Sequence, residues 1–358
     1  MSKIETGLMY FMALTLSVGV LAHEVEYDEH VELIPIPAFD HFNCDASGTS
    51  ALLALQKLLD ALPEESRNQM TFELDSLERY QWSNLPARMD PRSGINLDVL
   101  SDEQRALLFE FLASALGQQG YETVAGVMAA EAFLADDSKA ERFRWAPEYY
   151  WLSIYGEPSN SSEWAWAFGG HHLAINMTLD QGRVISMSPH FVGTEPARFT
   201  LDGIDYDLLT DMHEAGFKIY QSLDAGQKEF ATLTRAPREV LGGSGKDGVV
   251  PPIEGISVAQ MTGDQQRLVM EAVHIWVSHQ PAENSVPSME EIASDLSETY
   301  FAWFGEFDIT SPSYFRIQGP SVIVELLGGM RSVGSSAQNL GHYHTVYRDP
   351  TNDYGAGH

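Results

Sequence analysis

The sequence predicts an α+β protein in which helices pack on one side of an antiparallel sheet. Helix-like and strand-like patterns occupy separate blocks of the chain, whereas doubly wound folds with parallel sheets alternate them. Capping boxes and spaced apolar residues indicate the helices, and alternation of apolar with polar residues indicates the strands. Together these observations predict a single large domain over residues 50–358.

Helices are predicted where apolar residues recur on one face. Leucines spaced for such a face lie within residues 50–62, and Pro63 ends the run. Gly117 is expected to end a helix that begins near residue 101. Residues 121–134 and 208–223 have helical spacing as well. Capping boxes, in which a Ser or Thr precedes a Gln or Glu by three residues, occur at Ser101–Gln104, Thr262–Gln265 and Ser288–Glu291.

Strands are predicted where side chains alternate between apolar and polar. The clearest case is 173–179, which a turn at 180–182 connects to a partner strand at 183–187. A strand pair over 314–327 is interrupted by Gly319-Pro320, and 342–348 forms a late strand. The Gly-rich segment 242–248 is expected to be a loop without a nucleotide role, because it lacks the spacing of a phosphate-binding loop.

The charge excludes two classes of partner. Asp and Glu number 51 against 21 Lys and Arg, which gives a formal net charge of −30. Such a field repels nucleic-acid phosphates and anionic lipid headgroups. The carboxylates are dispersed along the chain, which favours a role in solubility. We therefore expect a small-molecule substrate or a metal as partner, and neither nucleic acid nor a membrane for the mature form.

The N-terminus has the features of an export signal. An uncharged apolar run over Leu8–Ala22 follows Lys3 and ends in small residues, which predicts a signal peptide over 1–22 and a periplasmic or secreted protein. The alternative is a retained anchor. If the signal peptide is cleaved, residues 23–49 form the N-terminal leader of the mature protein. Cleavage after Ala22 would expose His23, whose amine and ring can chelate copper. The single cysteine, Cys44, has no partner for an internal disulfide.

Histidines are the chemically most informative residues, and two of them open the strand at 173–179. Because strand side chains alternate, His171 and His172 are expected on opposite faces. His171 would share the apolar face and be a buried, hydrogen-bonded core residue. His172 would share the polar face with Asn176 and is the candidate metal ligand.

A second pair lies on the last strand. His342 and His344 are spaced to put both imidazoles on one face, about 6–7 Å apart along the chain. Neutral imidazole is a common ligand of zinc, copper and non-haem iron. The alternative is an ordinary polar strand face. We predict that His172, His342 and His344 bind one divalent transition metal, zinc or copper, and that their ring nitrogens approach within roughly 3–5 Å.

Charged residues in apolar surroundings complete the candidate site. Glu325 interrupts an apolar strand, where an unpaired charge is costly, and is predicted as fourth ligand or general base. Arg316 or Arg348 would hold an anionic or carbonyl group of the substrate. Glu131 lies on the apolar stripe of the helix 121–134. For Glu131 and Glu325 alike, the alternative is a structural ion pair, with Arg316 as one available partner.

The predicted function is a secreted metal-dependent enzyme, hydrolytic or oxidative. The chain has neither a Gly-x-Ser-x-Gly nor a His-Glu-x-x-His motif, so no serine hydrolase or zincin signature supports another mechanism. One alternative is a non-catalytic metal- or ligand-binding protein of the cell envelope. Another is a purely structural role for the histidines.

Several segments occur in the order of a known pattern. They are Tyr149-Tyr150, Tyr155–Ser159, Trp164–Asn176, Ser188–Gly193, Tyr314–Pro320, Ile323–Glu325, His342–Asp349 and Asn352–Gly355. With these segments the chain resembles an uncharacterised bacterial family, domain of unknown function 3500, over about 67–355. The resemblance implies no activity. It implies a shared residue pattern of Gly170, His171, His172, Arg316, Glu325, His342, His344, Arg348 and Asp349.

The chain departs from that family between Glu325 and His342. The family commonly has a polar stretch rich in Asn and Asp there, whereas this chain has Leu326–Met330 followed by a loop of Ser and Gly. Any ligand that this loop provides in the family is therefore in doubt here.

Overall fold

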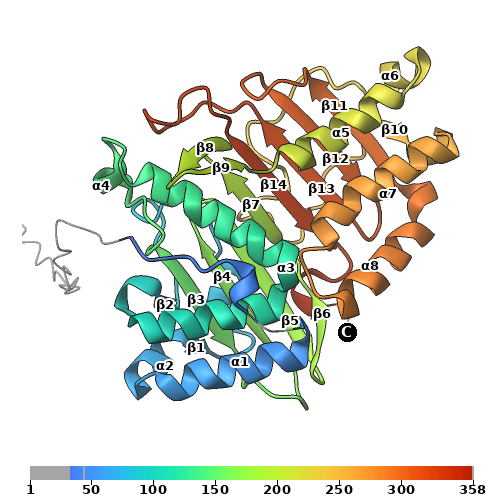
Figure 1. The fold of residues 1–358 in the computed structure, drawn as a ribbon. Helices are drawn as coiled ribbons and strands as arrows, with labels where there is room; N and C mark the ends of the chain where they lie inside the picture. The colour runs from blue at the N-terminus through green and yellow to red at the C-terminus, as the bar shows by residue number, and fades with distance from the viewer. Residues whose placement is uncertain (1–32, 43–44, 357–358) are drawn as a thin grey trace, which may run out of the picture. The chain divides into compact units, whose positions relative to one another are not determined.

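In the computed structural model, which describes residues 33–42 and 45–356, twelve strands form one sheet (Figure 1). Its order is β1-β3-β4-β5-β7-β14-β13-β12-β11-β10, with β2 paired to β3 and β6 to β5. The only parallel pairing between described strands joins β1 to β3. The strands of this sheet are β1 (Thr71–Phe72), β2 (Ile95–Asn96), β3 (Tyr150–Tyr155), β4 (Trp164–Gly170), β5 (Leu173–Asp180), β6 (Arg183–Ser186), β7 (His190–Thr194), β10 (Ile256–Ser257), β11 (Tyr300–Gly305), β12 (Ser313–Gln318), β13 (Ile323–Gly328) and β14 (Tyr343–Arg348).

The predicted strands lie near the centre of this sheet. β7 pairs with β5 on one side and with β14 on the other, and β13 pairs with β14. The expected break at Gly319-Pro320 separates β12 from β13. Strands β8 (Arg198–Leu201) and β9 (Ile204–Asp207) form a separate hairpin. The sheet therefore joins 173–180 to 343–348 through a strand that the alternation pattern alone did not indicate.

Helices cover one face of the sheet (Figure 1). Leu173 and Ile175 of β5 point into the core on that face, together with Val324 of β13. The α+β prediction is confirmed. The α-helices of the described residues are α1 (Gly48–Ala61), α2 (Glu64–Met70), α3 (Asp102–Leu134), α4 (Ala140–Phe143), α5 (Thr210–Ser222), α6 (Ala225–Ala231), α7 (Gly263–Val277) and α8 (Ala282–Ser294).

Capping decides where these helices begin. Ser101 and Thr262 form the predicted capping boxes of α3 and α7. As predicted, Gly117 ends a first helical segment, and a second one follows it within α3: the backbone at Gly117 is not helical, and its φ of 73° is open to glycine and costly for other residues. The capping box predicted at Ser288 is wrong, since that residue lies inside α8, which begins after Pro281. A capping box requires free backbone N–H groups, and these exist only in the first helical turn.

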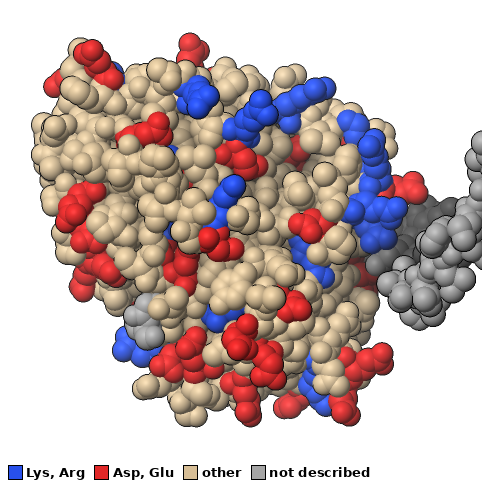
Figure 2. Space-filling model, turned by 180° about the vertical axis from the view of Figure 1, so that it is seen from behind, with Lys and Arg blue, Asp and Glu red and all other residues tan. Residues whose placement is uncertain are grey.

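Loops cover the opposite face of the sheet. Ala174, Phe191, Tyr314 and Val346 project from four strands on this side and form a second apolar cluster, which Trp82 also joins. Figure 2 shows the molecule from behind, with acidic side chains scattered over the surface and basic ones between them. The charges therefore form no single acidic block on this side.

The expected signal peptide at 1–22 and His23 lie outside the described residues, as does Cys44. The described part of the expected leader packs on the domain: Ile34 is buried, and its N–H donates to Glu148. Tyr121 donates its hydroxyl hydrogen to the Pro37 carbonyl at 2.8 Å. None of the helices that the structure describes is long and apolar enough to cross a bilayer.

Candidate metal centre

Three histidine rings, those of His172, His342 and His344, come together in the structure. Nε2 of His342 lies 3.2 Å from Nε2 of His172 and 3.2 Å from Nε2 of His344. The ring centroids form a nearly equilateral triangle with sides of 5.0, 5.1 and 5.2 Å. The predicted convergence of the three rings is confirmed, since one nitrogen from each lies within 4.8 Å of the others.

Each of the three rings has a glutamate near its other nitrogen, within hydrogen-bond distance only for His344. Nδ1 of His344 lies 2.8 Å from Glu239 Oε2. Nδ1 of His342 lies 3.7 Å from Glu195 Oε2 and 3.3 Å from the Arg331 carbonyl. Histidine ligands of metals usually donate this second nitrogen to a carboxylate or carbonyl, which orients the ring.

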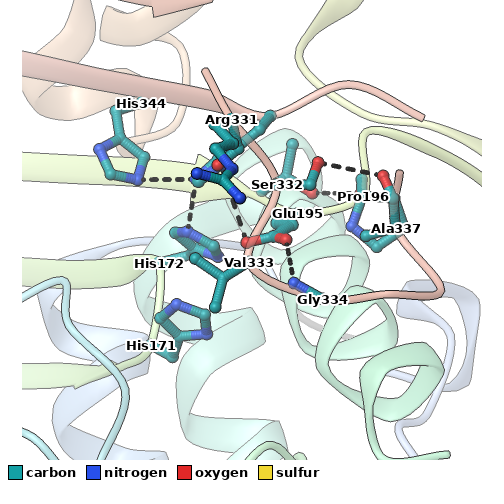
Figure 3. Close-up of polar contacts among 12 residues, drawn as sticks. His171, His172, Glu195, Pro196, Arg331, Ser332, Val333, Gly334, Ala337 and His344 are labelled. Atoms are coloured by element: carbon teal, nitrogen blue, oxygen red, sulfur yellow. Dashed lines mark hydrogen bonds and ion pairs between the residues drawn. The ribbon is translucent and has the colours of Figure 1, made fainter. Parts of the chain in front are cut away.

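The third glutamate is Glu131, on α3. Its Oε1 lies 3.9 Å from Nδ1 of His172 and 2.5 Å from Nδ1 of His171. Figure 3 shows His171 beside His172, with Glu195 between the cluster and the loop that carries Val333 and Gly334. Glu195 is held there by the Gly334 N–H, which donates to its Oε1 at 2.7 Å.

The backbone of His172 differs from the prediction. His171 and His172 form the turn between β4 and β5, and His172 has a φ of 60°. Strand alternation therefore does not apply to them, and the expectation of opposite faces is wrong. Their rings stack with centroids 3.7 Å apart. His172 reaches the cluster because it lies in a left-handed turn, a conformation that is costly for a non-glycine residue and often found at functional sites.

Two hydrogen bonds hold this turn in place. The N–H of His172 donates to the Asn84 carbonyl at 3.2 Å, and the His172 carbonyl accepts from the Gly193 N–H at 2.6 Å. Gly193 on β7 lies between the rings: a Cβ there would come within 3.0 Å of Cδ2 of both His172 and His344. A side chain at this position would therefore press on both rings, and glycine allows their close approach.

Burial favours the neutral imidazole of His342 and of His172. It lowers the pKa of His342 to about 3, and the neighbouring His344 adds to the shift. Burial also lowers the pKa of His172 well below its usual value. For the pair behind the cluster, burial raises the pKa of Glu131 and lowers that of His171, so neutral forms of both are favoured. Neutral imidazole is the form that binds metals.

Glu325 and Arg316 do not join the cluster. The Glu325 carboxylate accepts hydrogen bonds from the Leu241 and Gly242 N–H groups, at 2.8 and 2.7 Å, and from the Tyr314 hydroxyl. Arg316 donates to Glu254 at 3.0 Å. The prediction of Glu325 as fourth ligand is not supported by this geometry, because its oxygens are already used to hold the 241–242 loop against the sheet.

Arg348 is also occupied by protein groups. Its guanidinium forms ion pairs with Asp353 at 2.6 Å and Asp247 at 3.0 Å, and donates to the Gly242 carbonyl. Two carboxylates already neutralise this charge. A role for Arg348 or Arg316 in binding substrate would require these ion pairs to break.

Some residues around the centre were missed by the sequence patterns. Glu195 and Glu239 carried no signal of their own, although Glu195 follows the segment Ser188–Gly193 by two residues. His213 on α5 is buried, and its Nε2 lies 2.9 Å from the Ser313 hydroxyl. Only the fold shows which carboxylates lie behind which histidine.

The family model that matches the chain is described as "Protein of unknown function (DUF3500)" and covers residues 45–356. The chain belongs to this family. The resemblance inferred from the motifs is thereby confirmed. No curated protein and no solved structure matches the chain. The function of this DUF3500 member is therefore inferred from its histidine centre.

Proposed function

We propose that this protein is a secreted or periplasmic metal-dependent enzyme that binds one divalent transition metal, zinc or copper, through His172, His342 and His344. The observation that carries the proposal is the convergence of the three rings: one nitrogen of each faces a shared position, and a glutamate lies on the Nδ1 side of each ring, hydrogen-bonded in the case of His344. A zinc ion would activate water or polarise a carbonyl, and copper would support oxygen chemistry.

The nitrogen spacing supports a shared metal. Two nitrogens that each lie about 2.0–2.1 Å from a tetrahedral zinc are about 3.3 Å apart. The Nε2–Nε2 distances from His342 to His172 and to His344 are both 3.2 Å. A neutral imidazole has only one N–H, so a ring that donates its Nδ1–H outward presents a bare Nε2 lone pair to the other rings, which a cation would stabilise.

The number of ligands favours an enzyme over a structural site. Among the described residues, no fourth His, Cys, Asp or Glu joins the group. Structural zinc sites usually have four protein ligands, whereas catalytic sites have three and leave a position for water or substrate. Glu131, Glu195 and Glu239 lie on the Nδ1 side of the rings: Glu239 is 2.8 Å from Nδ1 of His344, whereas Glu131 and Glu195 lie beyond hydrogen-bond distance, at 3.9 and 3.7 Å.

One observation favours a second candidate, a non-catalytic metal-binding protein. The three rings belong to residues that are only 2%, 5% and 6% exposed. Such burial would suit a centre that retains a metal without turning over a substrate. The two candidates differ in whether an outside ligand can reach the metal.

Metal titration tests the proposal. Protein stripped with a chelator and titrated with Zn²⁺ or Cu²⁺ should bind one equivalent, and a His342→Ala/His344→Ala variant should bind almost none. A matched control is His190→Gln/His279→Gln, which alters another buried histidine pair with ring nitrogens 2.9 Å apart. Equal metal content in all three proteins would contradict the proposed centre.

Cobalt substitution distinguishes the two candidates. The visible spectrum of a Co²⁺ centre changes when azide enters the coordination sphere. A change on adding azide would support the enzyme, because it requires an accessible coordination position. A folded, cobalt-loaded protein whose spectrum ignores azide would support the non-catalytic protein.

Export is tested separately. We expect the mature protein to begin near residue 23, because the signal-like run ends at Ala22. N-terminal sequencing of protein recovered from the periplasm or medium checks this. Exported material that still begins with Met1 or Ser2 would contradict cleavage.

A further inference from the structure

A cavity lies between the loop 78–93 and strands β3, β4 and β5, and the centre of a water-sized molecule can occupy about 40 Å³ of it. Small residues on the strands, Ala167, Gly169 and Ala174, leave the room. Trp82 borders the cavity, and its ring also contacts Phe191, whose far side contacts the His344 ring. The cavity is therefore a neighbour of the histidine centre but separated from it by two aromatic side chains.

Two guanidinium groups line this cavity without a carboxylate partner. Arg79 donates to the Thr178 hydroxyl and the Tyr354 carbonyl, both at 2.7 Å. Arg92 donates to the Ser83 and Gly170 carbonyls at 2.8 and 3.0 Å. Within the part of the chain that the structure describes, neither forms an ion pair.

The contrast with other arginines indicates an anion. Arg316 and Arg348 are both neutralised by carboxylates, in a protein that carries a net charge of −30. Among the described residues, Glu78 is the one acidic residue of the lining, and its carboxylate accepts from the Ser76 hydroxyl, so the two guanidinium groups still leave the lining with a net positive charge. The positive charges of Arg79 and Arg92 are not compensated by a carboxylate, and a bound anion would compensate them.

Three buried polar atoms of the lining residues have no partner among the described groups: Nε1 of Trp82, Nε of Arg92 and Oδ1 of Asn176. The first two are N–H donors and the third is an acceptor. The amide of Asn176 is oriented by its Nδ2, which donates to the Pro189 carbonyl at 3.0 Å. Because the Pro189 carbonyl can only accept, the amide nitrogen of Asn176 must face it, and Oδ1 is the atom left without a partner.

We propose that this cavity binds a small hydroxycarboxylate. The carboxylate oxygens accept from Trp82 Nε1 and Arg92 Nε, and the ligand hydroxyl donates to Asn176 Oδ1. Charge-assisted bonds of this kind are the strong ones in proteins. The site does not depend on the metal, because none of these three residues belongs to the histidine centre.

The experiment uses lactate as probe and the full mature protein. In a ¹H–¹⁵N spectrum, the Trp82 indole signal, assigned by its loss in Trp82→Phe, should shift as lactate is added in the millimolar range. Propionate lacks the hydroxyl and should bind more weakly. Lactamide lacks the charge. Its affinity should be at least about tenfold lower than that of lactate, since hydrogen bonds to charged groups are stronger than those between neutral groups.

Calorimetry on variants completes the test. Trp82→Phe should weaken lactate binding about tenfold, because it removes one donor to a charged group. Asn176→Asp should weaken it further by placing a like charge beside the carboxylate. The matched control is Trp166→Phe, which removes another buried, unpartnered indole N–H that does not line the cavity and should leave binding unchanged.

Four results would overturn the proposal. They are no shift of the Trp82 signal with lactate, an equal shift with inorganic phosphate, equal lactate affinity in Trp82→Phe and wild type, and loss of lactate binding in the folded His342→Ala/His344→Ala variant. The last would place lactate at the histidine centre instead. Unchanged lactate binding by that variant supports an independent site, whatever its metal content.

Discussion

His172, His342 and His344 present the same nitrogen to one another, so the groups behind them determine how rigidly they are held. Glu239 is the most accessible of these groups: its side chain is 44% exposed, against 1% for Glu131 and Glu195. Replacing it therefore tests the orientation of a ligand without opening the core.

We expect Glu239→Gln to lower metal affinity about 10–100-fold, as loss of a carboxylate behind a ligating histidine does. The free energy of unfolding should change by less than about 1 kcal/mol, because the pair is partly exposed. Competition with a chromophoric chelator measures the affinity.

Glu254→Gln is the matched control. Its side chain is 49% exposed and pairs with Arg316, away from the three histidines. It should bind metal as wild type does, and a comparable loss in both variants would contradict the role assigned to Glu239.

Gly193 tests the close approach of the rings. A Cβ there would lie 3.0 Å from Cδ2 of His172 and of His344, so Gly193→Ala should push the rings apart. We expect destabilisation of about 1–3 kcal/mol from overpacking, and weaker metal binding. Gly263→Ala is the control, because its Cβ would meet nothing within 4 Å. Wild-type metal affinity in Gly193→Ala would show that the rings tolerate the methyl group.

At the scale of elements, a capping-box pattern in the sequence forms a cap only where it lies at the start of a helix. Thr262 accepts from the Gln265 N–H, and the Gln265 side chain accepts from the Thr262 N–H at 2.8 Å. Ser288 belongs to the same sequence pattern but lies inside α8, where the backbone N–H groups already have helical partners.

Thr262→Ala should therefore lower the free energy of unfolding by about 0.5–2 kcal/mol. Ser288→Ala should change it by less than about 0.5 kcal/mol, as substitutions away from such features usually do. Chemical denaturation of both variants measures the difference. Equal losses would mean that Ser288 has a structural role that its position does not explain.

At the scale of the whole molecule, buried histidines make stability depend on pH. Burial lowers the pKa of His213 to about 4, against an ordinary value of about 6.5. Between these values the unfolded chain binds a proton at this residue and the folded protein does not. Stability should therefore fall as the pH falls from 6.5 to 4, by up to about 1.4 kcal/mol per pH unit for each such histidine.

Comparison with His213→Gln isolates this contribution, because buried carboxylates with raised pKa values, such as Glu148 and Asp349, act in the opposite direction. The measurement is the free energy of unfolding of both proteins at pH 7, 6 and 5. The variant should lose less stability on acidification than wild type. Parallel curves would mean that His213 is protonated in the folded state as readily as in the unfolded one.

The sequence pattern was sufficient to predict the helices and strands that depend on local periodicity and capping. The alternation at 173–179, the break at Gly319-Pro320 and the capping boxes at Ser101 and Thr262 all predicted elements that the structure contains. Each of these features is decided by neighbours within a few residues.

What the chain determined about function was the composition of the centre. The spacing of His342 and His344, together with His172, indicated three imidazoles that converge, and the structure places their ring nitrogens within 4.8 Å. The reason assigned to His172 was nevertheless wrong, because its left-handed turn depends on contacts with Asn84 and Gly193, which are distant in sequence.

The tertiary structure alone decided which charges are available. Glu325, Arg316 and Arg348 were all candidates for the site in the sequence, yet each is satisfied by a loop that folds back over the sheet. Glu195 and Glu239, which had no distinguishing pattern, lie behind two of the histidines. Periodicity records which face a residue occupies, whereas pairing between charges depends on segments that meet only when the chain is folded.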